Sequence, residues 1–286
     1  MKTSTEIASL AKHVGMEKAI EMIAEAGFDS WDFSMFQMAR YDHENKRLRD
    51  TSWPIHSSEY TAYAKRLRQI GLDCGITCNQ SHAPFPVYVP EIRDLLKRAI
   101  EMTAIAGGEV CVIHPDNYKS AEENAEMYLE LLPFAHECGV KIATENMWLW
   151  NKEEDHAAPA ACSHHDDFVA HLNAVNDPYL VACLDIGHAE MYGLDTTARK
   201  SILALGDRLS ALHVHDNDLR KDSHQLPFTM KIDFEDMIAA LKEVNYKGYM
   251  TLEADAYLSK FDADTLAEGV KNMADTARRL ANMFEA

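Results

Sequence analysis

An aspartate and a histidine follow directly after a short apolar run of the chain. The run Val181–Leu184 contains no charged residue, which suits a β-strand covered on both faces. Asp185 comes where the run ends, Gly187 allows the chain to turn, and His188 follows. In a barrel of alternating strands and helices, side chains at the C-terminal ends of the strands carry the chemistry. The alternative is that Asp185 only caps the next segment and His188 is a solvated loop residue.

Other apolar segments of the sequence end in the same way, on carboxylates or imidazoles. The polar residues at these ends are Asp32, His82, His114, Glu145, Asp185, His213, His215 and Glu253. Carboxylates gathered at a buried mouth repel one another unless they are neutralised, and a divalent metal ion is the simplest neutraliser. Glu145, Asp185, His215 and Glu253 offer three carboxylates and one imidazole, a mixture that suits Mn²⁺, Zn²⁺, Co²⁺ or Mg²⁺. Taken singly, each is also compatible with a solvated position at the start of a loop.

Two histidines compete for the imidazole position. His213 and His215 are two residues apart on a predicted strand, so in regular geometry they point to the same face. His215 is nearer the C-terminal end and precedes a polar loop, which favours it as the metal ligand. His213 is then expected one layer deeper on the same face.

The elements that position these residues repeat along the chain as strand, loop, amphipathic helix and glycine. Glycines at 27, 71, 107, 139, 206 and 248 precede predicted strands and suit left-handed helix ends. Ser120, Asp195, Asp233 and Asp262 are expected to cap helices. Eight strands and eight helices over residues 1–286 predict a single (β/α)8 TIM barrel domain. The strands are expected near 2–7, 29–33, 72–78, 110–113, 140–144, 181–185, 209–214 and 249–252. An open doubly wound sheet is the alternative, but the Gly-rich phosphate turn typical of its first strand is not seen.

Composition narrows the function classes. The 286 residues include 28 basic and 46 acidic ones, a net charge of −18, which disfavours nucleic acid and anionic membranes as partners. The first residues lack the apolar core of a signal peptide, and no run is long and apolar enough to span a bilayer. The six cysteines show no close zinc pairing and are expected to be reduced core thiols in a cytoplasmic protein.

The strand endings resemble those of the sugar isomerase/epimerase superfamily, the xylose-isomerase-like TIM barrels. The similar segments are Ile142–Asn146, Leu184–His188, Leu212–Asn217 and Thr251–Glu253, in an order that extends over essentially the whole chain. The superfamily includes ketohexose 3-epimerases, hydroxypyruvate isomerases, inosose dehydratases and, more distantly, endonuclease IV. The resemblance implies that Glu145, Asp185, His215 and Glu253 bind one divalent metal and that His188 touches a substrate oxygen.

A segment after the seventh strand adds a complication. Asp222-Ser-His224 looks like the loop that binds an extra zinc in the endonuclease branch, and that branch uses histidines similar to His82 and His114 for another. Met230 stands where the family often has glycine. The resemblance therefore permits up to three metals. A single metal is preferred, with His82 and His114 binding substrate, because an endonuclease must hold DNA and this chain is strongly acidic.

Metal-assisted enediolate chemistry on a small sugar or sugar acid fits these residues. Glu145 and Glu253 are expected to remove and return the proton beside a carbonyl, giving an isomerase or epimerase. Trp148 and Arg220 are expected near the substrate, and the long loop after Glu145, reaching about residue 161, is expected to cover it. No Gly-rich phosphate loop is seen, which favours a non-phosphorylated substrate.

Other functions remain open on the sequence. A lyase of the inosose dehydratase type uses the same ligands but releases water. An endonuclease IV-like phosphodiesterase and a barrel that binds a sugar without turning it over are further alternatives. The expected partner is a small-molecule carbohydrate, and the sequence leaves open a homo-oligomer.

Overall fold

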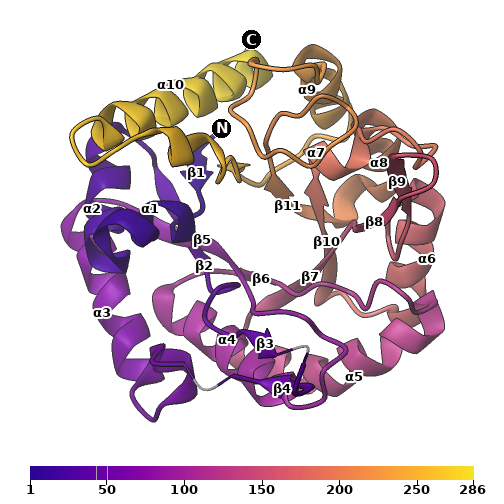
Figure 1. The fold of residues 1–286 in the computed structure, drawn as a ribbon, viewed down its shortest axis with the longest axis horizontal. Helices are drawn as coiled ribbons and strands as arrows, with labels where there is room; N and C mark the ends of the chain where they lie inside the picture. Colours follow the sequence, from indigo (N-terminus) through magenta and orange to yellow (C-terminus); the bar gives the residue numbers. More distant parts are fainter. Residues whose placement is uncertain (43, 50) are drawn as a thin grey trace.

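The computed structural model of the protein describes residues 1–42, 44–49 and 51–286. Within these residues, eight parallel strands form a closed ring, which confirms the predicted TIM barrel (Figure 1). Six strands form one sheet in the order β11-β10-β7-β6-β5-β2, and β1 pairs with β12. Parallel bridges from Glu6 to Asp32 and from Val214 to Leu252 join the two sheets and close the ring. The barrel strands are β1 (Thr3–Thr5), β2 (Ser30–Ser34), β5 (Thr77–His82), β6 (Val110–Val112), β7 (Lys141–Glu145), β10 (Leu180–Asp185), β11 (Leu209–His213) and β12 (Met250–Leu252).

Helices surround the ring, and more of them occur than the expected one for each strand (Figure 1). Two helices follow β1 and two follow β10. The helices are α1 (Ala8–Val14), α2 (Met16–Ala26), α3 (Tyr60–Asp73), α4 (Ile92–Ala106), α5 (Ala121–Cys138), α6 (His165–Val175), α7 (Ile186–Ala189), α8 (Ala198–Leu205), α9 (Phe234–Glu243) and α10 (Leu266–Glu285), with 3-10 turns η1 (Pro54–His56), η2 (Gly206–Arg208) and η3 (Tyr257–Lys260).

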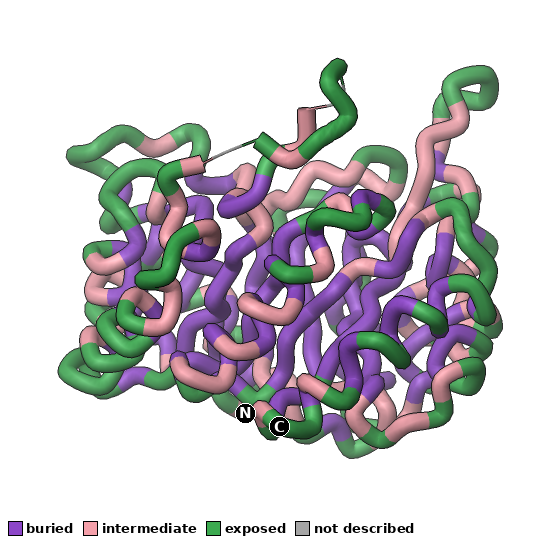
Figure 2. Tube along the Cα trace, turned by 90° about the horizontal axis from the view of Figure 1, so that it is seen from below, coloured by how far each residue is buried: buried purple, intermediate pink, exposed green. Residues whose placement is uncertain are grey.

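Two antiparallel hairpins stand in the loops after barrel strands. They are β3 (Tyr41–Asp42) with β4 (Arg47–Leu48), and β8 (Trp148–Asn151) with β9 (His156–Pro159). Figure 2 shows the β3–β4 segment rising above the buried barrel, at the end opposite to the two termini. The β8–β9 hairpin accounts for the long loop that the sequence predicts after Glu145.

Several local end signals in the sequence are confirmed, although Gly248 does not close α9, whose C-terminal cap is Val244. Gly27, Gly107 and Gly139 close α2, α4 and α5 with φ angles of 105°, 93° and 68°. Ser120 forms a full capping box with Glu123, and the Asp233 side chain caps α9. The cap expected at Asp195 is wrong, because Thr197 caps α8. Asp262 lies three residues before Thr265, the residue that precedes α10, and its side chain accepts the N–H groups of Asp264 and Thr265 at 3.1 Å.

The sequence-based prediction of the third barrel strand, at residues 72–78, is wrong for most of its length. Helix α3 continues through Gly71 to Asp73, and β5 starts only at Thr77. Gly71 therefore lies inside the helix, where a Cβ atom would come within 2.9 Å of the Trp31 indole nitrogen. The turn is made at Gly75, which has a φ of 79°. The glycine at 71 reflects close packing of the helix on the barrel and does not mark the helix end.

The hydrophobic core lies in two layers. The larger one fills the space between the strands and the helices and includes Trp31, Phe33 and Phe168, each 0% exposed. A smaller cluster fills the barrel interior, with Val110, Val112, Ala143, Val181, Cys183 and Ala211. Each fully buried large apolar side chain contributes about 1.5–3 kcal/mol to folding. These layers fix the barrel rim on which the polar side chains stand.

The cysteines are free thiols in the described residues. Four are buried, as the sequence indicates, but Cys74 is exposed and Cys138 only partly buried, so the expectation that every one lies in the core is wrong. Among the described residues, no helix is both long and apolar enough to cross a membrane.

Candidate active site

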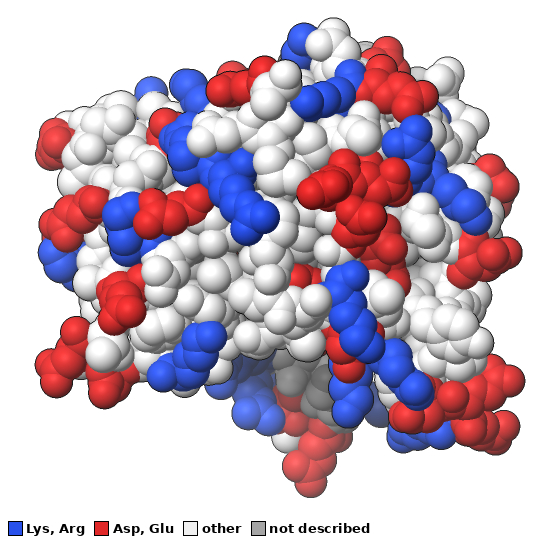
Figure 3. Space-filling view, turned by 90° about the horizontal axis from the view of Figure 1, so that it is seen from above, with Lys and Arg blue, Asp and Glu red and all other residues white. Residues whose placement is uncertain are grey.

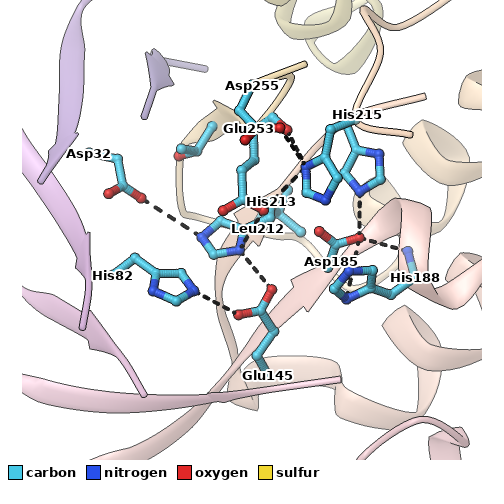
Figure 4. Close-up of polar contacts among 12 residues, drawn as sticks. Asp32, His82, Glu145, Asp185, His188, Leu212, His213, His215, Glu253 and Asp255 are labelled. Atoms are coloured by element: carbon cyan, nitrogen blue, oxygen red, sulfur yellow. Dashed lines mark hydrogen bonds and ion pairs between the residues drawn. The ribbon is translucent and has the colours of Figure 1, made fainter. Parts of the chain in front are cut away.

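Neighbouring strands place the polar residues side by side at one rim of the barrel. Strand β10 lies between β7 and β11, with Cys183 opposite Glu145 and Asp185 opposite His213. His82, Glu145, Asp185 and His213 are each the last residue of a strand. His114, His215 and Glu253 follow their strands closely. Because parallel strands share one direction, all these side chains meet at the C-terminal mouth, as Figure 4 shows for most of them.

One group of contacts centres on Glu145, and we call it the glutamate cluster. One oxygen of Glu145 lies 2.8 Å from Nδ1 of His213, and the other lies 3.1 Å from Nε2 of His114 and 3.5 Å from Nε2 of His82. A carboxylate oxygen of Glu253 lies 3.4 Å from the same Nδ1 of His213. The cluster therefore holds two carboxylates on one imidazole, with two further histidines beside them: its members are His82, His114, Glu145, His213 and Glu253.

A second group centres on two aspartates, and we call it the aspartate cluster. Nε2 of His215 lies 3.1 Å from Asp185 and 3.5 Å from Asp222. Nε2 of His188 lies 3.2 Å from Asp222, and Nε2 of His224 lies 3.1 Å from Asp222. The cluster comprises Asp185, His188, His215, Asp222 and His224, and it adjoins the first cluster through His224, whose Nδ1 lies 3.9 Å from Glu253.

The four residues predicted to share a metal are all at the mouth but divide between the clusters. Glu145 and Glu253 contact His213, whereas the ring of His215 contacts Asp185 and Asp222. The two rings separate because regular pairing of β11 ends at His213, and beyond it Val214 makes only an isolated bridge to β12. The ring of His213 stacks with His82 at 5.5 Å, and that of His215 stacks with His224 at 3.9 Å.

Burial and mutual charge shift the pKa values of the glutamate cluster in opposite directions. Burial raises the pKa of Glu145, but the charge of His213 and bonds from His114, His213 and His82 outweigh it, so the pKa lies well below its usual range. Burial raises the pKa of Glu253 to about 8, against the lowering effects of His213 and His224. Burial lowers the pKa of His114 to about 4. Two carboxylates with pKa values pushed apart are typical of catalytic sites.

The aspartate cluster is arranged as charged pairs. Burial raises the pKa of Asp185, but His188 and His215 outweigh it and lower the pKa to about 2. Burial lowers the pKa of His188, but Asp185 and Asp222 raise it to about 10. The pKa of Asp222 lies far below its usual range, because His188 and His224 outweigh burial. Such pairing holds the carboxylates ionised, the form in which they bind metal ions.

Both clusters fit a divalent metal ion in the chemistry of their donor atoms. Among the described residues, four buried polar atoms of the clusters make no hydrogen bond of good geometry, namely Glu145 Oε2, Asp185 Oδ2, His213 Nε2 and Asp222 Oδ1. Glu145 Oε2 and Asp222 Oδ1 have only ion-pair contacts with histidine nitrogens. Donor atoms of His82, His114 and Glu145 lie within 4.8 Å of one another, as do those of His188, His215, Asp222 and His224. A buried polar atom without a good hydrogen bond is costly in free energy, so atoms of this kind mark places where an ion or ligand can bind.

Residues that the sequence reasoning did not select hold the mouth in shape. The Asn146 side chain donates to the carbonyl of Asp185 at 2.9 Å and accepts from its backbone N–H at 2.8 Å, and the Asn146 carbonyl accepts from His188 at 2.9 Å. The Asn217 side chain donates to the Gly187 carbonyl at 2.9 Å. The sequence offered one signal for both residues, namely an amide side chain close to a predicted metal ligand. Such side chains can donate to and accept from backbone groups at strand ends.

Asp216 organises the loop that carries Asp222 and His224. Its buried carboxylate accepts backbone N–H groups from Met230 at 2.8 Å, Lys231 at 3.1 Å and Ile232 at 3.0 Å. The loop backbone at Met230 is thus fixed by this carboxylate.

A cavity of about 410 Å³ opens above the clusters. Its lining includes His82, His114, Glu145, His188 and Glu253, together with Trp148 from β8. The predicted substrate residue Arg220 does not line the cavity, because its guanidinium lies 3.0 Å from the Asp155 carboxylate and its side chain is 53% exposed. Glu6, which follows β1, is a buried rim residue that the sequence reasoning missed; burial raises its pKa.

Comparison with known proteins places this barrel in a family. The xylose isomerase-like TIM barrel family model matches residues 20–282. The chain is 25% identical over 253 residues to an L-ribulose 3-epimerase of Methylomonas sp. (strain DH-1), covering 84% of this chain and 78% of that one. Among solved structures, a D-tagatose 3-epimerase-like protein matches with a TM-score of 0.69 and 20% identity over 100% of both chains. The 3-keto-D-glucoside 4-epimerase of E. coli matches with a TM-score of 0.68 and 14% identity over 99% of both. The chain belongs to the xylose isomerase-like TIM barrel family.

Proposed function

We propose that this protein is a metal-dependent isomerase or epimerase of a small sugar or sugar acid that works through an enediolate. The observation that carries the proposal is the pair of glutamates on His213. Glu145 and Glu253 come from different strands, and both reach the floor of the cavity. Two carboxylates in such a position can act on a substrate carbon as acid and base.

The side chains of this cavity suggest a division of labour. One glutamate takes the proton beside the substrate carbonyl, and the other returns a proton to the same or the neighbouring carbon. His82, His114 and His188 line the cavity and would hydrogen bond substrate oxygens. Trp148 and Phe85 would limit access of water to the reacting carbon.

A single divalent ion, Mn²⁺, Zn²⁺, Co²⁺ or Mg²⁺, would stabilise the negative charge of the enediolate when bound. Glu145, Asp185 and Glu253 are its proposed carboxylate ligands. For the imidazole ligand, His213 contacts both glutamates, whereas His215, the residue that the sequence favours, contacts Asp185. Alanine variants of the two histidines distinguish them. The aspartate cluster could hold an additional zinc.

The relatives support the carbohydrate class. One relative is an L-ribulose 3-epimerase, one structural neighbour is a 3-keto-D-glucoside 4-epimerase, and another is a D-tagatose 3-epimerase-like protein. Release of water, as in a dehydratase, would need the same residues, and the mass of the product separates the two reactions. The free cysteines agree with a cytoplasmic location, which we propose with the function.

A second candidate is a multinuclear phosphodiesterase, because His188, Asp222 and His224 add a second group of metal-binding residues. Charge argues against it. The net charge is −18, and on the face drawn in Figure 3 basic side chains are interspersed with acidic ones. Proteins that bind DNA neutralise phosphates with concentrated Lys and Arg.

Proton exchange tests the proposal without a named product. The protein, freed of metal and reloaded with each of the four ions, is incubated with a panel of ketoses in deuterated water, and deuterium uptake beside the carbonyl is followed by NMR. Glu145→Gln and Glu253→Gln should each lower exchange by about 10³-fold, because general acid–base catalysis is worth about 10²–10⁴. Glu137→Gln, an exposed change on α5, is the matched control.

Full exchange in either glutamine variant would refute the proposal. Metal affinity measured by calorimetry should fall more in His213→Ala than in His215→Ala if His213 belongs to the same site as the glutamates. Cleavage of abasic-site DNA with no exchange from any sugar would favour the phosphodiesterase instead.

A further inference from the structure

An aromatic wall lines the cavity above its polar floor. Its members are Phe36, Phe85, Tyr88, Tyr118 and Trp148, all of which line the cavity. The wall begins directly on the histidines, because the Phe85 ring stacks on His114 at 4.9 Å and 15°. Phe36 in turn lies parallel to Phe85 at 6.4 Å and meets His82 edge-on at 5.4 Å. A substrate whose reacting carbons lie beside these histidines would therefore also touch the aromatic wall.

Part of this wall is exposed to solvent. Phe85 is 40%, Tyr88 46% and Tyr118 78% exposed, and all three line the same cavity. Exposed aromatic surface gathered at one place marks a binding site for an apolar group. Sugar hydroxyls alone would be poor partners for these rings, because ligand pockets use apolar walls for apolar ligand surface and a few polar groups for orientation.

Basic side chains are missing from the cavity. Among the described residues that line it, none is Lys or Arg, and the acidic ones include Asp116, Asp222 and Asp255. The nearby Lys119 lies 4.0 Å from Asp116, and Arg220 is paired with Asp155 outside the cavity. A phosphate or carboxylate on the far end of the substrate would meet no side-chain cation of this kind. An uncharged substrate fits better.

The size of the cavity exceeds that of a simple sugar. At about 30 Å³ for each water in the liquid, the cavity of about 410 Å³ holds roughly 14 waters. A ketohexose has fewer non-hydrogen atoms than that, and each takes less volume than a separate water because the atoms are covalently bonded. The sugar would therefore leave part of the cavity, and with it part of the aromatic wall, uncovered. An additional ring or alkyl chain on the sugar would cover it.

We propose that the substrate is an uncharged sugar derivative that carries an aromatic or alkyl group away from the reacting carbons, and that this group lies on the aromatic wall. The inference rests on the proposed function and names the substrate class for it. The sugar places its carbonyl end over Glu145 and Glu253, while the apolar group packs on Phe85 and Tyr118 near the mouth.

A pair of keto sugars that differ only in the apolar group provides the test. Methyl and phenyl 3-keto-β-glucopyranosides both keep hydrogens beside the ketone, so deuterium uptake reports turnover of each. The ratio of kcat/KM for the phenyl sugar to that for the methyl sugar should be about tenfold or more. A free ketohexose should exchange faster than its terminal phosphate.

Alanine variants show which side chains cause the preference for the phenyl sugar. Phe85→Ala and Tyr118→Ala should each bring the phenyl-to-methyl ratio down severalfold towards one. Tyr192→Ala should leave the ratio as it is, because Tyr192 is also an exposed tyrosine, at 67%, but does not line the cavity. Circular dichroism checks that each variant is folded.

Binding separates this inference from the proposed function. Phenyl and methyl β-glucopyranosides lack the ketone, and their binding is followed by fluorescence of Trp148 and its neighbour Trp150. Deuterium exchange with a phenyl-to-methyl ratio of kcat/KM near one would overturn the inference, as would a high ratio that is unchanged in both alanine variants. Either result would still support an isomerase or epimerase. Selective phenyl binding that is lost in Phe85→Ala, without exchange from any keto sugar, would overturn the proposed function and support the apolar subsite. Neither binding nor exchange would overturn both.

Discussion

Replacing Gly187 with alanine should disturb the aspartate cluster through a single methyl group. Gly187 lies in α7, which begins directly after Asp185, and an added Cβ would overlap ring atoms of His215. The ring has little room to move, because His215 is 0% exposed, lies 3.1 Å from Asp185 and stacks on His224 at 3.9 Å.

Opposing effects set the size of the change. Overpacking in a filled core costs about 1–3 kcal/mol. The loss of chain freedom in the unfolded state on replacing glycine with alanine favours folding by about 0.4–1 kcal/mol. The overlap wins, and the free energy of unfolding should fall by about 1–2 kcal/mol. With an m-value of about 3 kcal/mol/M, the urea midpoint would fall by about 0.5 M.

A double-mutant cycle shows whether the ring of His215 is the cause. His215→Ala alone should destabilise the protein by about 2–4 kcal/mol, because it removes a buried side chain. In the double variant the methyl group fills part of the space that the ring leaves, so the two changes should be less than additive by at least about 1 kcal/mol. Urea unfolding followed by tryptophan fluorescence supplies the four free energies. Additivity within about 0.5 kcal/mol would refute the overlap as the origin of the effect.

Two further predictions concern contacts away from the glutamates. Asp29 accepts the Thr3 N–H at 2.8 Å and lies 2.6 Å from the Arg278 guanidinium, so its carboxylate connects β1 to α10. Asp29→Asn should lower the free energy of unfolding by about 1 kcal/mol, measured by urea unfolding at pH 7. Burial raises the pKa of Asp29, but the Thr3 and Arg278 contacts outweigh it, so the folded-state pKa is lowered. The stabilisation by Asp29 is therefore present above the unfolded-state pKa of about 3.9 and is lost as the pH falls through the lower folded-state pKa. A difference between wild type and variant that grows below pH 4 would contradict this. Asp216→Asn removes an acceptor from a carboxylate that binds the backbone N–H groups of Met230 at 2.8 Å and Ile232 at 3.0 Å. It should cost about 2 kcal/mol, or about 5 °C in Tm, and lower turnover by displacing the loop with Asp222 and His224; calorimetry that shows an unchanged Tm would count against this role.

Chemical type and order along the chain were readable from the sequence. Apolar runs followed by carboxylates or imidazoles predicted the barrel and the rim residues, because a buried strand must be apolar and the end of a strand is the first place where a charged side chain can leave the core. Glycines at 27, 107 and 139 marked helix ends for a local reason, their left-handed φ. Gly71 did not, because its cause is the Trp31 ring, which is distant in sequence.

The grouping of the rim residues was decided only by the tertiary structure. Periodicity puts His213 and His215 on one face, but the end of regular pairing on β11 sends one ring to the glutamates and the other to the aspartates. The role of Asp216 likewise depends on a loop that returns to it from fourteen to sixteen residues further along. Sequence fixes which groups reach the mouth because strand direction is a local property, whereas the distances between them depend on register, bends and loop packing that involve the whole barrel.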